Sequence, residues 1–112
     1  MSVTIYHNPK CSKSRQALDL LREKGIEPTI VEYLKAPPSV EELRQILKML
    51  GLPAKQIIRA KEAKEAGVDP DLPEAALVEA MADNPAVIER PIVVNGDRAA
   101  LGRPPENVLG IL

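Results

Sequence analysis

The sequence is poor in the residues that build disulfides and metal centres. Its 112 residues contain one cysteine, Cys11, and one histidine, His7. A lone cysteine excludes an internal disulfide, and Ser14 stands where a Cys-x-x-Cys pair needs its second thiol. Two soft ligands are too few for the tetrahedral set of a structural zinc site. We therefore expect no bound metal or cofactor, and any redox cycle must take its second thiol from another molecule.

A strong net charge and a long apolar run are also missing. The chain carries 15 Lys and Arg against 16 Asp and Glu, so its net charge of −1 gives no general attraction to nucleic acid or anionic membranes. No apolar run approaches the ~20 residues of a membrane span, and the first residues lack the pattern of a signal peptide. We expect a cytoplasmic, monomeric protein with one domain, residues 1–112, and without nucleic-acid or membrane partners.

The first third of the chain predicts a βαβ unit. Residues 3–6 form a β-type run, residues 12–24 carry apolar side chains at helical spacing, and Gly25 is the stop. A second β-type run at residues 29–33 follows so closely that the two strands are expected to be parallel. Cys11 then lies at the carboxyl end of the first strand, the sheet edge where open α/β proteins bind ligands.

The middle of the chain predicts helices. Ser39 and Glu42 have capping-box spacing at the start of a helix that Gly51 ends. Further helices are predicted from Pro53 to residue 58 and from Pro73 to residue 84. Between them, residues 60–73 are charged and rich in turn formers, and we predict a mobile surface loop there.

The last third returns to strands. Residues 92–94 and 98–101 flank Asn95 and Gly96, a pair typical of a tight hairpin. Residues 104–112 predict a closing helix that begins at two prolines. The predicted order is thus β-α-β, helices, then β-β-α, with a helical insertion at about 39–84.

The segment around Cys11 has the features of a reactive thiol. A helix N-terminus stabilises a thiolate through its free N–H groups and its dipole, and Lys10, Lys13 and Arg15 add positive charge. The same arrangement can cradle a tetrahedral oxyanion, so one segment can both bind an anion and attack it. The alternative is a buried cysteine with a structural role.

Three more arginines are candidate oxyanion ligands, because a guanidinium donates two parallel hydrogen bonds: Arg59, Arg90 and Arg103. Taken singly, each fits a solvated surface arginine better than an anion ligand, because charged residues are mostly exposed. Pro91 follows Arg90 at a strand entry, where a cis peptide bond can occur. His7 either lowers the pKa of the thiol or serves as a hydrogen-bonded loop histidine. The Cys-x3-Arg spacing is too short for a phosphatase loop of the Cys-x5-Arg type.

Four segments together resemble the glutaredoxin-coupled arsenate reductases, and more closely the arsenate-reductase-related members of that family. The segments are residues 4–15 (TIYHNPKCSKSR), 32–38 (EYLKAPP), 90–94 (RPIVV) and 102–104 (GRP). The resemblance runs through nearly the whole chain. Residues 60–67 depart from the usual pattern of the family.

The resemblance implies an α/β fold of the thioredoxin-like class, with a mixed four-stranded sheet flanked by helices. It further implies a nucleophile at Cys11, oxyanion-binding arginines at positions 59, 90 and 103, and supporting roles for His7, Ser14, Arg15 and Pro91. The implied reaction reduces arsenate to arsenite, with glutathione as co-substrate and glutaredoxin as partner. The lone cysteine agrees with this scheme, because the scheme needs an external thiol.

Two other functions stay open at this stage. The chain can be a thiol-dependent reductase of another substrate, such as a glutathione mixed disulfide. It can also be a regulator of the Spx type, which binds RNA polymerase and senses thiol oxidation. Those regulators usually carry Cys-x-x-Cys, which Ser14 interrupts here.

Overall fold

The computed structural model describes residues 2–112 and contains two compact units. The first joins the N-terminal segment, up to Ala36, with Arg90–Leu112, and the second is Pro37–Glu89. The predicted insertion, residues 39–84, falls inside the second unit. Across the described part of the chain, no helix has the length and apolar character needed to cross a bilayer.

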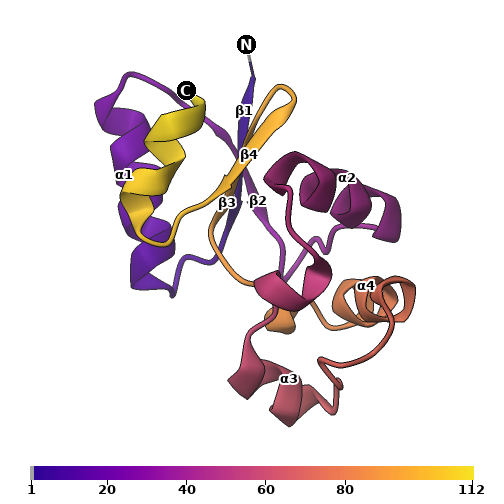
Figure 1. Cartoon of the computed structure of the whole chain (residues 1–112). Helices are drawn as coiled ribbons and strands as arrows, with labels where there is room; N and C mark the ends of the chain where they lie inside the picture. Colours follow the sequence, from indigo (N-terminus) through magenta and orange to yellow (C-terminus); the bar gives the residue numbers. More distant parts are fainter. Residues whose placement is uncertain (1) are drawn as a thin grey trace. The chain divides into compact units, whose positions relative to one another are not determined.

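The first unit is built on a mixed four-stranded sheet with the order β2-β1-β3-β4 (Figure 1). Strand β1 pairs in parallel with β2 and antiparallel with β3, and β3 pairs antiparallel with β4. The predicted βαβ unit, hairpin and fold class are therefore confirmed. The elements of this unit are β1 Val3–His7, α1 Ser12–Glu23, β2 Thr29–Glu32, β3 Ile92–Asn95, β4 Arg98–Leu101 and the 3-10 helix η3 Pro105–Ile111.

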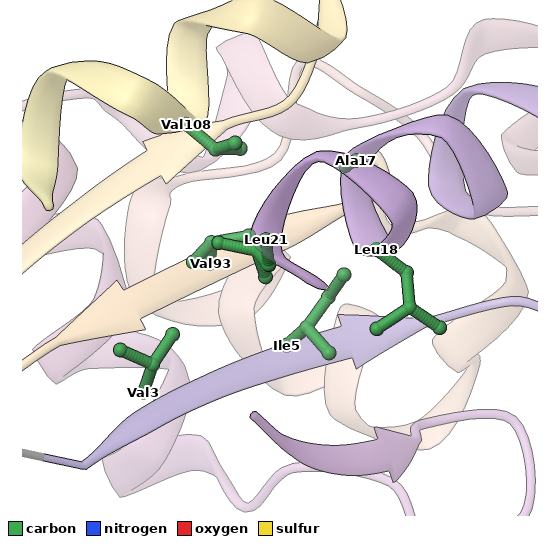
Figure 2. Close-up of a cluster of buried hydrophobic side chains, with 7 residues drawn as sticks. All are labelled: Val3, Ile5, Ala17, Leu18, Leu21, Val93 and Val108. Atoms are coloured by element: carbon green, nitrogen blue, oxygen red, sulfur yellow. The ribbon is translucent and has the colours of Figure 1, made fainter. Parts of the chain in front are cut away.

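A compact apolar core joins α1 and η3 to one face of this sheet (Figure 2). Alternate residues of β1 are buried because successive side chains of a strand point to opposite faces. Helix α1 contributes side chains at helical spacing, and burial of each large aliphatic chain stabilises the fold by roughly 1.5–3 kcal/mol. The core residues are Val3, Ile5, Ala17, Leu18, Leu21, Val93 and Val108. This packing holds the N-terminus of α1 at the carboxyl end of β1.

A glycine brings two later segments of the first unit close together. A Cβ atom built on Gly102 would lie 2.6 Å from Cγ of Pro91, which no real side chain tolerates. The backbone N–H of Gly102 also donates to the carbonyl oxygen of Pro91 at 2.9 Å. The Arg90–Pro91 and Arg103–Pro104 peptide bonds are both cis. Arg90 and Arg103 are thus carried on two segments that pack directly against each other.

The second unit is helical. The capping box of Ser39 and Glu42 is present, and Gly51 ends the first helix in the left-handed conformation at φ 68°. Both carboxylate oxygens of Glu74 accept hydrogen bonds from the backbone N–H of Ala54, at 3.0 and 3.1 Å. The elements are α2 Val40–Leu50, η1 Ala54–Ile57, α3 Ala60–Ala66, α4 Glu74–Asp83 and η2 Pro85–Val87.

Two sequence-based predictions were wrong in detail. The loop predicted at 60–73 contains α3, because Ala63 is completely buried and Gly67 ends the helix with a φ of 72°. Charged residues on the outside of this short helix concealed its one buried position. The closing segment is a 3-10 helix, in which side chains three residues apart share one face, as Val108 and Ile111 do against the core.

Candidate active site

A tight turn after β1 places Cys11 at the start of α1. The backbone N–H of Cys11 donates to the carbonyl oxygen of Asn8 at 3.0 Å, which closes a turn with Pro9 at its second position. Oδ1 of Asn8 also accepts from the backbone N–H of Lys10 at 3.0 Å. Cys11 is the N-cap residue of α1, in extended conformation, and its free thiol is partly exposed. This exposure argues against a purely structural, buried cysteine.

The surroundings of the sulfur favour the thiolate. Partial burial by itself raises the pKa of Cys11. The backbone N–H groups of Ser14 and Lys13 and the guanidinium of Arg90 favour the negative charge on the sulfur, and together they hold the pKa of Cys11 below the usual value of a cysteine. The thiolate fraction near neutral pH is therefore larger than that of an ordinary cysteine, and the thiolate is the nucleophilic form.

Arg90 and Arg103 converge on the thiol. Nη2 of Arg103 lies 3.6 Å from Sγ of Cys11, and Nε of Arg103 donates to the carbonyl oxygen of Arg90 at 2.8 Å. Arg90 contributes its own hydrogen bond to the sulfur. Two guanidinium groups and two backbone N–H groups therefore meet at one sulfur. Such a set can stabilise both a thiolate and an oxyanion bound beside it.

His7 and Ser14 form a buried pair behind the turn. Oγ of Ser14 lies 2.6 Å from Nδ1 of His7 and accepts from the backbone N–H of Asn8 at 3.1 Å. Burial lowers the pKa of His7, against the attraction of Glu32, and Arg22 and Arg15 lower it further. The imidazole is thus neutral near pH 7, and His7 is the last residue of β1 rather than a loop residue. It connects to the thiol site through Ser14, whose backbone N–H favours the thiolate.

Arg15 and Arg59 have other partners. Nη1 of Arg15 donates to the carbonyl oxygen of Pro9 at 2.9 Å, so this exposed arginine braces the turn. Arg59 belongs to the second unit, where Nε contacts Oε2 of Glu62 at 2.5 Å and Nη1 contacts Oε1 of Glu89 at 2.9 Å. The structure therefore assigns Arg59 two carboxylate partners, and its contribution to an oxyanion site stays a prediction.

Within residues 2–112, no group of three His, Cys, Asp or Glu side chains is arranged to hold a metal ion. The site consists of one sulfur, cationic donors and backbone N–H groups. Such a set of groups can supply a thiolate nucleophile and bind an anion beside it.

Sequence reasoning missed two residues that shape this site. Asn8 makes hydrogen bonds around the turn through its side chain, its carbonyl oxygen and its N–H group. An asparagine directly before proline is a known turn signal and was available in the sequence. Gly102 allows close contact with Pro91. No local pattern reveals this contact, because the two residues meet only through the tertiary fold.

Comparisons with known proteins give one consistent family. Residues 6–111 match the ArsC family. The chain is 53% identical to an arsenate reductase of Haemophilus influenzae, with all of both chains covered. It is 52% identical to the uncharacterized protein YfgD of Escherichia coli, over 98% of this chain and 96% of that one. An arsenate reductase structure from Vibrio cholerae has a TM-score of 0.93 and 52% identity, over 100% of this chain and 98% of that one.

We predict that Ser14→Ala destabilises the protein by about 1–3 kcal/mol, because the N–H of Asn8 and Nδ1 of His7 lose a partner in a buried place. Urea unfolding followed by circular dichroism measures the loss. Ser12→Ala is the matched control, since Ser12 is exposed in the same turn of α1. Equal stability of the two variants would contradict the role given to the Ser14 hydroxyl.

We predict that Arg90→Gln moves the pH profile of Cys11 alkylation by iodoacetamide to higher pH. The guanidinium lowers the pKa of the thiol, so its removal leaves less thiolate at pH 7 and slows alkylation there. Arg98→Gln removes the same charge from an exposed position on β4 and serves as the control. A profile of Arg90→Gln that superimposes on the wild-type profile would remove Arg90 from the thiol environment.

Proposed function

The chain belongs to the ArsC family, and on this premise we propose that it reduces arsenate to arsenite with Cys11 as the nucleophile. The observation that carries the proposal is the convergence of Arg90, Arg103 and the first turn of α1 on the Cys11 sulfur. A tetrahedral oxyanion needs several donors, and its reduction by this route needs a thiolate beside them. The site supplies both at one place.

In the first step, the Cys11 thiolate attacks arsenic(V). A sulfur–arsenic bond forms, one arsenic–oxygen bond breaks, and the oxygen leaves as water after protonation. The guanidinium groups of Arg90 and Arg103 hold the remaining oxygens and offset their negative charge. Arg59 lies outside the four segments that carry the resemblance and is paired with Glu62 and Glu89, so the mechanism assigns it no step.

In the second step, glutathione supplies the other thiol. Its thiolate bonds to arsenic while the arsenic–oxygen double bond opens and that oxygen takes up a proton. The two sulfurs then join as a disulfide while both sulfur–arsenic bonds break. The electron pair stays on arsenic, which leaves as arsenite, so two thiolates are oxidised and arsenic(V) is reduced to arsenic(III). A glutaredoxin thiolate then attacks the glutathione sulfur and returns Cys11 to the thiolate. Within the described chain Cys11 has no second cysteine to resolve it, which supports this external route.

The remaining site residues support the nucleophile rather than react. We assign Ser14 and neutral His7 to the positioning of the α1 N-terminus, Arg15 to the bracing of the turn, and Pro91 to the approach of Arg90. We also propose that the protein works as a monomer in the cytoplasm, where cellular thiols keep a lone cysteine reduced.

A second candidate function is thiol exchange with a glutathione mixed disulfide. The observation that favours it is a partly exposed thiol with a lowered pKa, which is all that such an exchange requires. The two functions differ in their need for guanidinium donors, because a disulfide carries no oxyanion. A regulator of the Spx type is disfavoured, since Ser14 occupies the position of its second cysteine.

We predict that Cys11→Ser abolishes arsenite production and leaves the fold intact, because the change removes the nucleophile with little change in volume. The assay supplies arsenate, glutathione and glutaredoxin to the purified protein and measures arsenite. Circular dichroism of the variant is the control for folding. Turnover that survives in the folded variant would end the proposal. An inactive wild-type protein whose Cys11 still exchanges with a glutathione mixed disulfide would favour the second function.

We predict that Arg103→Gln raises the KM for arsenate by about tenfold or more, the effect of losing hydrogen bonds to a charged group. Arg103→Lys keeps the charge but not the planar fork, and we expect it to recover only part of the loss. Arg44→Gln, at an exposed position on α2, is the charge-matched control. An unchanged KM in Arg103→Gln would show that this arginine does not bind the oxyanion.

A further inference from the structure

Asn8 is the first residue after β1 and is only 9% exposed, although its side chain is polar. Its backbone and side chain bind three different parts of the site. The carbonyl oxygen accepts from Cys11, Oδ1 accepts from the N–H of Lys10, and the N–H donates to Oγ of Ser14.

The hydrogen bond of the Asn8 side chain has a structural consequence for the thiol. A side-chain oxygen that accepts from the N–H two residues later forms an Asx turn, which closes the backbone before Cys11. The same turn is closed a second time by the bond between Cys11 and the Asn8 carbonyl oxygen. Cys11 is thereby held in the extended N-cap conformation, with φ −94° and ψ 123°.

The conformation of this N-cap decides which donors reach the sulfur. Because Cys11 is the N-cap residue, its sulfur lies at the N-terminus of α1, where the N–H groups of Lys13 and Ser14 favour the thiolate. Oγ of Ser14 accepts from the N–H of Asn8, so one hydrogen bond joins the first turn of α1 to the residue after β1. A loosened turn would therefore move the sulfur away from the N-terminus of α1 and reduce the stabilisation of the thiolate.

We propose that Asn8 is a positioning residue of the thiol site: its side chain locks the turn that aims the first-turn N–H groups of α1 at Cys11. This role deepens the proposed function, because Asn8 acts on the thiolate fraction of Cys11. It assigns Asn8 no contact with arsenate. It applies equally if the thiol serves another substrate.

The test is the rate of Cys11 alkylation by iodoacetamide as a function of pH, in the full chain and without arsenate. In Asn8→Ala we expect the profile to move to higher pH and the rate at pH 7 to fall about twofold to tenfold, the range that the loss of one net hydrogen bond corresponds to. In Asn8→Ser a hydroxyl can form a weaker turn of the same kind, so we expect a smaller shift in the same direction.

The control is Asn84→Ala, which removes a hydrogen bond to the carbonyl oxygen of Ala80 at the end of α4. Like Asn8→Ala, this variant loses one hydrogen bond between an asparagine side chain and the backbone, but it should keep the wild-type alkylation profile. A folded Asn8→Ala protein with the wild-type profile would overturn the proposal. If Asn8→Ala does not fold, Asn8→Ser decides, and an unshifted profile in that variant overturns the proposal as well.

The alkylation readout also separates this proposal from the proposed function. A shifted profile in Asn8→Ala combined with no arsenite production by the wild-type protein would support the positioning role and reject arsenate reduction. Arsenite production by the wild-type protein with an unshifted profile in Asn8→Ala would support arsenate reduction and reject the positioning role.

Discussion

One sulfur atom that is held partly out of water is the constraint on which the rest of this structure depends. Burial by itself raises the pKa of Cys11 and so opposes the thiolate. Donor groups of the protein must therefore replace the water that would solvate the negative charge. The donors come from three segments that are far apart in the sequence: the first turn of α1, Arg90 and Arg103. The sheet, the apolar core beneath α1 and the close contact of Gly102 with Pro91 hold these segments in place.

The site separates neutral groups from charged ones. Behind the turn, the polar groups are neutral: His7 loses its charge through burial, and Ser14 and Asn8 satisfy one another. The cationic groups lie toward the thiol or the surface. This division follows from electrostatics, since a buried charge without a partner is costly whereas a neutral network costs little once every donor is paired. It leaves the guanidinium groups near the sulfur to bind an anion.

The separation of neutral and cationic groups fits the reaction that we propose. A reductase with one cysteine must expose that cysteine to a second thiol after the oxyanion has bound. Cys11 is partly exposed, and the groups that stabilise its thiolate are backbone N–H groups and guanidinium groups fixed by other contacts. Those groups are therefore already in place before the oxyanion arrives, so no reorganisation is needed at the moment of reaction.

The sequence by itself determined most of the local structure. The strands, α1, the capping box of Ser39, the hairpin at Asn95 and the position of Cys11 at the start of a helix all follow from neighbours along the chain. Helix α3 escaped prediction because one buried alanine, Ala63, carries its packing. Only the tertiary structure decided that Arg90 and Arg103 meet at Cys11 and that Arg59 is bound by Glu62 and Glu89. The physical reason is range: periodicity and capping act over a few residues, whereas the meeting of charged side chains depends on how distant segments pack.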